Sequence, residues 1–173
     1  MTLHDAATLG EARAWLRERL VAGERCPCCE QTARVYVRPM SHVSARAIIA
    51  LYRAHRRDFG HMPSILAEQL PDVAHQGGQA TLGAHWGLIE EERTQRPDGG
   101  RAGYWRVTAA GETWIRGAST IASHARLYSG RCLGHTGTPV SVREVLGSRF
   151  DLEALMGPAL SDAPEQLTLG VAA

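Results

Sequence analysis

The residues best suited to metal chemistry form two pairs that lie far apart in a chain of 173 residues. The first pair is a C-x-x-C in which Pro27, directly after the first cysteine, tightens the turn. The second pair is a C-x-x-H at the same spacing. Thiolate and imidazole are the ligands that zinc prefers, and a tetrahedral site needs four of them. The sequence therefore predicts one closed, structural zinc site with these ligands: Cys26, Cys29, Cys132 and His135.

Two other interpretations of the cysteines stay open. Either the thiols are ordinary side chains and the histidine is incidental, or the C-x-x-C is a redox motif. A redox C-x-x-C usually follows a strand and opens a helix, whereas this one follows a predicted helix and Gly23. Cys28 either replaces a neighbouring cysteine as ligand or is a spare thiol. In a reducing compartment, four cysteines favour metal binding or free thiols over disulfides.

The first pair lies between a predicted helix and a predicted strand. Apolar residues at helical spacing predict the helix over residues 7–22. Alternation of side chains predicts the strand over residues 33–38, which Pro39 ends. A second, broadly apolar helix is predicted over residues 41–55, with Ser44 or Ser41 as its cap, Arg46 on its outside and Gly60 as its breaker.

The middle of the chain continues this second helix into a helix-turn-helix pattern. Pro63 near the first turn predicts a third helix that runs to Leu70. A helix, two strands joined by a polar turn, and a return helix then follow, and this order is typical of a winged helix-turn-helix in the α+β class. The predicted ranges are helix 76–86 with Gly87 as its stop, strand 88–92, turn 97–100, strand 104–108 and helix 109–115, which Thr108 can cap.

The C-terminal part contains the second ligand pair. We expect short strands at 125–128 and 138–142 to flank a loop that holds the C-x-x-H. Ser141 can cap a helical turn that extends to Leu146, and Asp151 can cap a helix over residues 152–156. The predicted regions are an N-terminal helix, knuckle and strand (1–39), the winged-helix domain (40–117), a C-terminal segment that completes the zinc site (118–157) and a loose tail (158–173).

Several strings of the sequence resemble a group of small phage and prophage proteins. That group carries an N-terminal CPxC-type zinc knuckle, a winged-helix middle and a final segment from Phe to Leu-Met. The resemblance implies a winged-helix fold and a phage origin, and it implies no activity. Glu30 stands where the knuckle of the group usually has Gly. The similarity covers roughly residues 26 to 156, and the strings that carry it are 26–31, 45–53, 86–90, 103–111 and 150–156.

A winged helix offers a specific set of donors to DNA. Gln pairs with adenine in the major groove, Thr and His contact base or phosphate, and Arg clamps phosphates. Net charge is only +1, and the acidic residues 90–92 lie beside the wing, so two features oppose DNA binding. The predicted DNA-binding residues are Gln76, Gln79, Thr81 and His85 in the reading helix, Arg93, Arg96 and Arg101 in the wing, and Arg53, Arg56 and Arg57 as flanking contacts.

The leading functional hypothesis is a phage-encoded DNA-binding or regulatory protein with a structural zinc. The alternative is a protein-interaction module, such as a phage inhibitor of a host defence or transcription complex. We expect double-stranded DNA as the partner, with a host protein complex as the alternative. The sequence does not determine the oligomeric state, and a homodimer is one option.

The sequence favours a non-enzyme. Seven histidines lie outside the C-x-x-H, but no H-E-x-x-H, nucleophile elbow or phosphate loop accompanies them. A Cys–His nucleophile pair stays open, because such pairing is spatial. The start of the chain lacks a basic region followed by an apolar core, and no apolar run reaches the length of a membrane span. We therefore expect no membrane partner and a cytoplasmic location, in the host cell if a phage encodes the chain.

Overall fold

The computed structural model describes residues 7–92 and 103–160 and divides the chain into two compact units. Unit 1 comprises the chain up to Met40 together with Ala122–Pro139, and unit 2 comprises Ser41–Ile121 and the chain from Val140 onward. The predicted C-terminal segment 118–157 thus contributes to both units. Helices account for 49% and strands for 24% of the structure, which confirms the α+β class.

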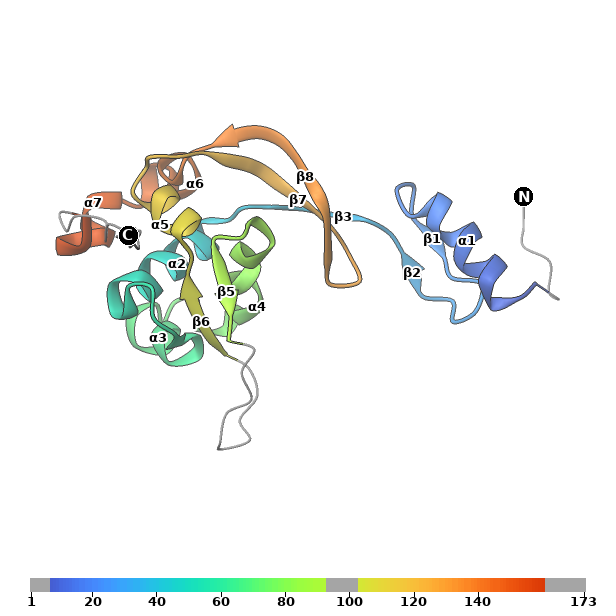
Figure 1. The fold of residues 1–173 in the computed structure, drawn as a ribbon, viewed down its shortest axis with the longest axis horizontal. Helices are drawn as coiled ribbons and strands as arrows, with labels where there is room; N and C mark the ends of the chain where they lie inside the picture. The colour runs from blue at the N-terminus through green and yellow to red at the C-terminus, as the bar shows by residue number, and fades with distance from the viewer. Residues whose placement is uncertain (1–6, 93–102, 161–173) are drawn as a thin grey trace, which may run out of the picture. The chain divides into compact units, whose positions relative to one another are not determined.

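Unit 1 consists of one helix, a small knuckle and a three-stranded sheet. Thr8 begins α1 with a capping box, in which its side chain and that of Glu11 exchange hydrogen bonds with the backbone. The sheet has the strand order β3-β7-β8, and Figure 1 shows β7 and β8 as a long hairpin. The elements are α1 (Leu9–Arg19), β1 (Glu24–Arg25), β2 (Thr32–Ala33), β3 (Tyr36–Pro39), β7 (Ile121–Tyr128) and β8 (Arg131–Val140).

Two sequence predictions in unit 1 are wrong in detail. The single strand predicted over 33–38 is divided into β2 and β3, because the first part pairs with β1 and the second pairs with β7. The C-x-x-H lies inside β8 and not in a loop. Gly134 and Gly137 adopt positive φ within this strand (123° and 87°), which only glycine accommodates easily.

Unit 2 surrounds α2 (His42–His55), in which ten consecutive residues from Val43 to Tyr52 are buried. A helix that is buried on all sides must have neighbours on all sides. Figure 1 shows α3, α5 and strand β6 beside α2. The other elements are β4 (Gly60–His61), α3 (Met62–Gln69), η1 (Ala74–Gln76), α4 (Gly77–Ala80), η2 (Thr81–Trp86), β5 (Ile89–Glu91), β6 (Tyr104–Val107), α5 (Ala109–Ile115), α6 (Val142–Leu146), η3 (Gly147–Arg149), α7 (Leu152–Met156) and η4 (Gly157–Leu160).

Both ends of α2 are set by local chemistry. The Ser41 side chain accepts a hydrogen bond from the backbone N–H of Ser44, so the predicted cap is confirmed. The helix ends at His55, the predicted last residue, because Arg56 adopts a positive φ of 55°. Gly60 begins β4 instead of breaking the helix. A Cβ there would lie 2.2 Å from the His55 ring, so only glycine fits.

The prediction that Arg46 lies on the outside of this helix is wrong. Arg46 is buried, with only 8% of its surface exposed. Its two terminal nitrogens donate to the Asp72 carboxylate at 2.7 and 2.9 Å, and its guanidinium lies 4.5 Å from the centre of the Phe150 ring. Both partners are distant in sequence, so periodicity alone placed this residue wrongly.

The predicted helix over 76–86 is helical but is not one regular α-helix. A four-residue α-helix, α4, lies between the 3₁₀ turns η1 and η2. The predicted stop at Gly87 is confirmed, with a left-handed φ of 70°. The predicted caps Thr108, Ser141 and Asp151 are also confirmed for α5, α6 and α7.

The last described residues are part of the fold and not of a loose tail. Residues Gly157–Leu160 form a 3₁₀ turn in which Ala159 is buried. The rest of the predicted tail lies outside the described residues. Among the residues that the structure describes, no helix combines the length and apolar character needed to cross a membrane.

Candidate nucleic-acid interface and candidate metal ligands

The helical segment α4–η2 presents the predicted reading residues with unequal exposure. Gln79 is exposed, whereas Gln76, Thr81 and His85 are half-buried. The Thr81 hydroxyl donates to the carbonyl oxygen of Gly77 at 3.3 Å, so part of its polarity is used within the segment. Gln79 is therefore the reading residue with the side chain most available to a partner.

The opposite side of this segment is fixed on α2. Ala80 and Gly83 are buried, and a Cβ on Gly83 would lie 2.7 Å from the Ile48 side chain. The Ser44 hydroxyl donates to the carbonyl oxygen of Gln79 at 2.6 Å. This contact holds the backbone of Gln79 while its side chain points to solvent.

The predicted flanking arginines lie at the other end of α2. Arg53 and Arg56 are exposed and Arg57 is half-buried. The Arg56 guanidinium lies 5.2 Å from the centre of the Tyr52 ring. Ser44 and Arg53 are nine residues apart on one helix, a rise of about 14 Å. The structure thus places Gln79 and these arginines at opposite ends of α2 and does not bring them into one cluster.

The wing residues Arg93, Arg96 and Arg101 lie outside the described residues, as does the predicted turn at 97–100. The strands at its base are described. Glu90 on β5 accepts a hydrogen bond from Arg106 on β6 at 2.6 Å, and that guanidinium lies 4.8 Å from the centre of the Phe59 ring. Glu90, which belongs to the acidic residues that opposed phosphate binding, is therefore paired. Arg106 was not predicted as a site residue, because its position opposite Glu90 follows only from the register of the strands.

The C-x-x-C lies in the knuckle between β1 and β2. The Cys26 amide donates to Gln31 and the Glu30 amide donates to Cys26, each at 2.8 Å, which closes the turn. Glu30 adopts a positive φ of 58°, the conformation for which a glycine is usual. Backbone hydrogen bonds from Cys28, then Cys29, lower the pKa of the Cys26 thiol. Such amide-to-sulfur contacts are those that stabilise a thiolate ligand.

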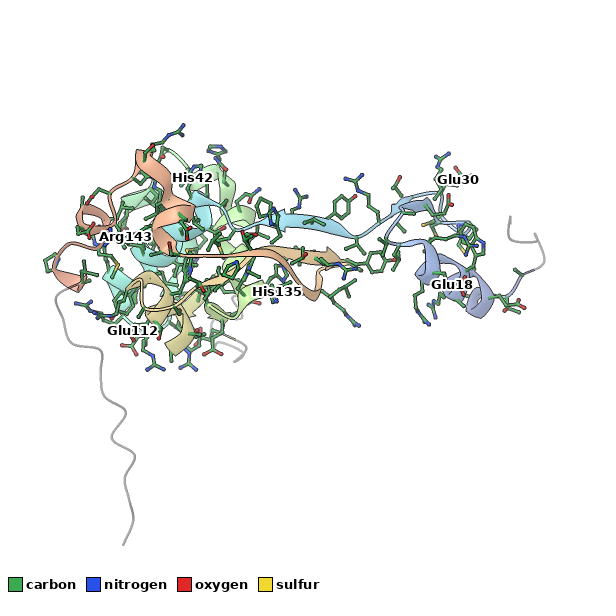
Figure 2. All side chains as sticks on the ribbon, turned by 90° about the horizontal axis from the view of Figure 1, so that it is seen from above. Glu18, Glu30, His42, Glu112, His135 and Arg143 are labelled. Atoms are coloured by element: carbon green, nitrogen blue, oxygen red, sulfur yellow. The ribbon has the colours of Figure 1, made fainter. Side chains whose placement is uncertain are left out.

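The C-x-x-H on β8 also has ligand geometry. The Cys132 sulfur lies 3.7 Å from Nε2 of His135. Ordinary zinc–sulfur and zinc–nitrogen bonds in a tetrahedron separate the two ligand atoms by about 3.6 Å. The Cys132 thiol donates to the Gly134 carbonyl oxygen at 3.5 Å, and His135, labelled in Figure 2, is exposed.

The structure forms the two ligand pairs but does not join them. Among residues 7–92 and 103–160, no group of three or more His, Cys, Asp or Glu side chains is arranged to hold a metal ion. All four cysteines are free thiols. A pocket of about 280 Å³ in unit 1 is lined by Cys26 and Cys29, and also by Tyr128 and Ser129 from the turn that leads into β8.

A buried polar cluster in unit 2 was not predicted from the sequence. The Tyr52 hydroxyl donates to Glu112 at 2.5 Å, and Arg116 donates to Glu112 at 3.1 Å and to the Tyr52 oxygen at 2.8 Å. Arg116 also donates to the carbonyl oxygen of Leu160. Burial, followed by the hydrogen bond to Glu112, raises the pKa of the Tyr52 phenol. Tyr52, Glu112 and Arg116 all have hydrogen-bond partners within the cluster. We therefore interpret the cluster as a structural link between α2 and α5.

Comparison of the chain with protein-family models, with curated proteins and with solved structures gives no match.

Proposed function

We propose that this chain is a phage-encoded, winged-helix DNA-binding or regulatory protein that carries a structural zinc. The observation that carries the proposal is the order of elements in unit 2. Helix α2 is followed by strand β4, helix α3, the helical segment α4–η2 and strands β5 and β6. The sheet order is β4-β6-β5, and both pairs are antiparallel.

This order supports a winged helix because each part has its counterpart in that fold. In a winged helix, the short strand after the first helix pairs with the last strand, and the second and third strands form the wing. Here Gly60 and His61 pair with Trp105 and Tyr104, and β5 pairs with the other edge of β6. We take the helical segment α4–η2 as the counterpart of the reading helix in this proposal.

The exposed groups of unit 2 support DNA as the partner. Gln79 can form paired hydrogen bonds with adenine, and Arg53 and Arg57 can contact phosphates. The pairing of Glu90 with Arg106 also reduces the negative charge at the base of the wing. We therefore propose that Gln79 reads a base, and that Arg53 and Arg57 position the protein by contacting phosphates of the DNA backbone.

The test is selection of a preferred duplex from a random library with the full chain, followed by affinity measurements. Gln79→Ala should reduce the preference for the selected sequence about 5- to 150-fold, which corresponds to one bidentate base contact. The matched control is Gln69→Ala, an exposed glutamine at the end of α3. Arg53→Ala combined with Arg57→Ala should lower affinity for all duplexes alike. Failure to enrich any duplex would overturn the proposal.

The proposed zinc is supported by donor chemistry and by the two formed pairs. Cys26, Cys29, Cys132 and His135 would hold it, and a closed Cys₃His set gives a structural ion. Bound there, zinc would join the N-terminal and C-terminal parts of unit 1. Cys28 is exposed and either substitutes for a neighbour or remains a thiol.

A protein-docking function is the second candidate, and one pocket favours it. This pocket of about 230 Å³ in unit 2 is predominantly apolar and is lined by Met62, Leu66 and Trp105 together with backbone of Gly77 and Gly103. Such a pocket suits an apolar side chain of a protein partner. If the library yields no duplex, Trp105→Ala, at a half-buried residue that lines the pocket, should abolish capture of a host complex, while Gln79→Ala should not.

A further inference from the structure

The basic and acidic residues of this chain are separated in sequence, and the β3–β7–β8 sheet joins the basic parts. Residues 31–57 and 113–143 contain ten arginines and no Asp or Glu. The whole chain has 19 basic and 18 acidic residues, so these stretches carry +10 and the remainder carries −9. All three strands of the sheet belong to the two acid-free stretches. The strands themselves carry three arginines, Arg38, Arg126 and Arg131, and no carboxylate, so the sheet is basic on a nearly neutral protein.

The first strand of this sheet is exposed on both faces. All four residues of β3 are exposed, including Tyr36 at 40% and Val37 at 54%. Of the five large apolar side chains exposed among the described residues, these two and Leu133 lie on the sheet. A soluble domain rarely leaves a sheet uncovered without a binding role.

One face of β3 carries an aromatic ring between two cations. Tyr36 and Arg38 lie two residues apart and therefore on the same face, about 7 Å apart along the strand. The Arg34 guanidinium lies 4.7 Å from the centre of the Tyr36 ring, and that of Arg38 lies 5.5 Å from it. Across the strand, Tyr36 is opposite Leu127, which is half-buried, and Arg38 is opposite Ala125, which is fully buried. The sheet is therefore covered beside Arg38, and the open part of this face is at Tyr36.

From this arrangement we infer that the Arg34–Tyr36–Arg38 face of unit 1 binds a single strand of nucleic acid. Unpaired bases stack on aromatic rings and on guanidinium planes, and phosphates pair with arginines. The absence of carboxylates from the sheet removes the repulsion that such a strand would otherwise meet. A duplex keeps its bases stacked internally and cannot use the Tyr36 ring in this way. This site belongs to unit 1 and does not depend on the duplex-reading function proposed for unit 2.

The test is fluorescence anisotropy of labelled oligo(dT) and oligo(rU) with the full chain, at salt between about 50 and 200 mM. The double variant Arg34→Ala, Arg38→Ala should make the log–log salt dependence shallower by about 1.4, because each phosphate contact on a single strand contributes about 0.7. The matched control is Arg13→Ala, Arg17→Ala, which removes two exposed arginines from α1 in the same unit. It should leave the slope unchanged.

The aromatic ring has its own pair of variants. Tyr36→Ala should weaken oligo(dT) binding about tenfold, the loss expected for one stacked base, whereas Tyr36→Phe should retain it. Melting followed by circular dichroism should show that all of these exposed-site variants remain folded. Gln79→Ala should leave oligo(dT) binding intact, which separates this site from the reading segment of unit 2.

Three results would overturn the inference. The first is equal weakening by the two double arginine variants, which would show that only total charge matters. The second is displacement of oligo(dT) by poly-glutamate at equal charge, which would point to an acidic protein partner. The third is loss of duplex binding equal to that of single-strand binding in the Tyr36→Ala variant.

Discussion

Unit 2 is built around a helix that is buried on every side, whereas unit 1 is built around a sheet whose first strand is exposed on both faces. Of the 28 buried apolar residues in the described chain, only Ala12, Leu20, Met40 and Ala125 belong to unit 1. A region of this size with so few buried apolar groups needs another source of stability. We therefore expect the cysteines to contribute most to stability in unit 1, where few apolar residues are buried.

The largest expected effect is that of zinc removal on unit 1. Cys26→Ser or Cys132→Ser should lose about one zinc per chain and unfold unit 1, because binding of a structural zinc is worth about 10–16 kcal/mol of folding free energy. Elemental analysis and amide hydrogen exchange measure the two parts of this prediction. Unit 2 should keep its exchange protection. Protein purified without chelator and found free of metal would remove zinc from the account.

The second prediction concerns the apolar core of unit 2. Leu51 is fully buried in α2, so Leu51→Ala should lower the free energy of unfolding of unit 2 by about 2–5 kcal/mol. Urea denaturation followed by tryptophan fluorescence measures this. Leu9→Ala makes the same chemical change at a residue that is 56% exposed and should cost less than about 0.5 kcal/mol. Equal losses from the two variants would contradict the contrast between the units.

A smaller loss is expected from the buried polar cluster. Tyr52→Phe removes the hydroxyl that bonds Glu112 and Arg116, and should cost about 1–3 kcal/mol because both partners lose a buried hydrogen bond. Tyr36→Phe is the control, since that ring is exposed. If urea denaturation shows that Tyr52→Phe lowers the free energy of unfolding no more than Tyr36→Phe does, the cluster does not stabilise the fold.

The smallest effect concerns pH. Hydrogen bonds from Arg46 hold the pKa of the Asp72 carboxyl below its usual range. A lowered folded-state pKa means that the pair stabilises unit 2 above the usual value of about 3.9, and that this contribution is lost as pH falls through the lowered pKa. Between pH 6 and pH 3 the urea midpoint should therefore fall further for the native chain than for Asp72→Asn. An equal fall of the urea midpoint in the two proteins would contradict the stabilising role given to the Arg46–Asp72 pair.

Local chemistry explains which parts of the fold could be predicted. Ser41, Thr108, Ser141 and Asp151 were all identified as helix caps, because a cap depends on residues within one turn. Strand β4 was not predicted. Its two residues carry no alternation, and they form a strand only because Tyr104 and Trp105 pair with them.

The site was harder to predict than the fold, since its geometry is non-local. The burial of Arg46 depends on Asp72 and Phe150, and the pairing of Glu90 depends on the register with Arg106. The two ligand pairs could be recognised by their spacing. The position of the C-x-x-C in a knuckle was predicted, whereas the C-x-x-H was predicted in a loop and lies inside β8. Strand alternation alone predicts that Arg34, Tyr36 and Arg38 share one face, and the structure shows them together. The exposure of that face could not be predicted, because it depends on the pairing of β3 with β7.

The central claim is that unit 2 binds duplex DNA, and a salt titration tests it most directly. Binding of the full chain to a duplex should weaken as salt rises, with a log–log slope of about −0.9 for each phosphate contacted, and several contacts are expected. Arg53→Ala combined with Arg57→Ala should make that slope shallower by about 1.8. Absence of duplex binding at about 50 mM salt, or a slope that the variant leaves unchanged, would contradict the account.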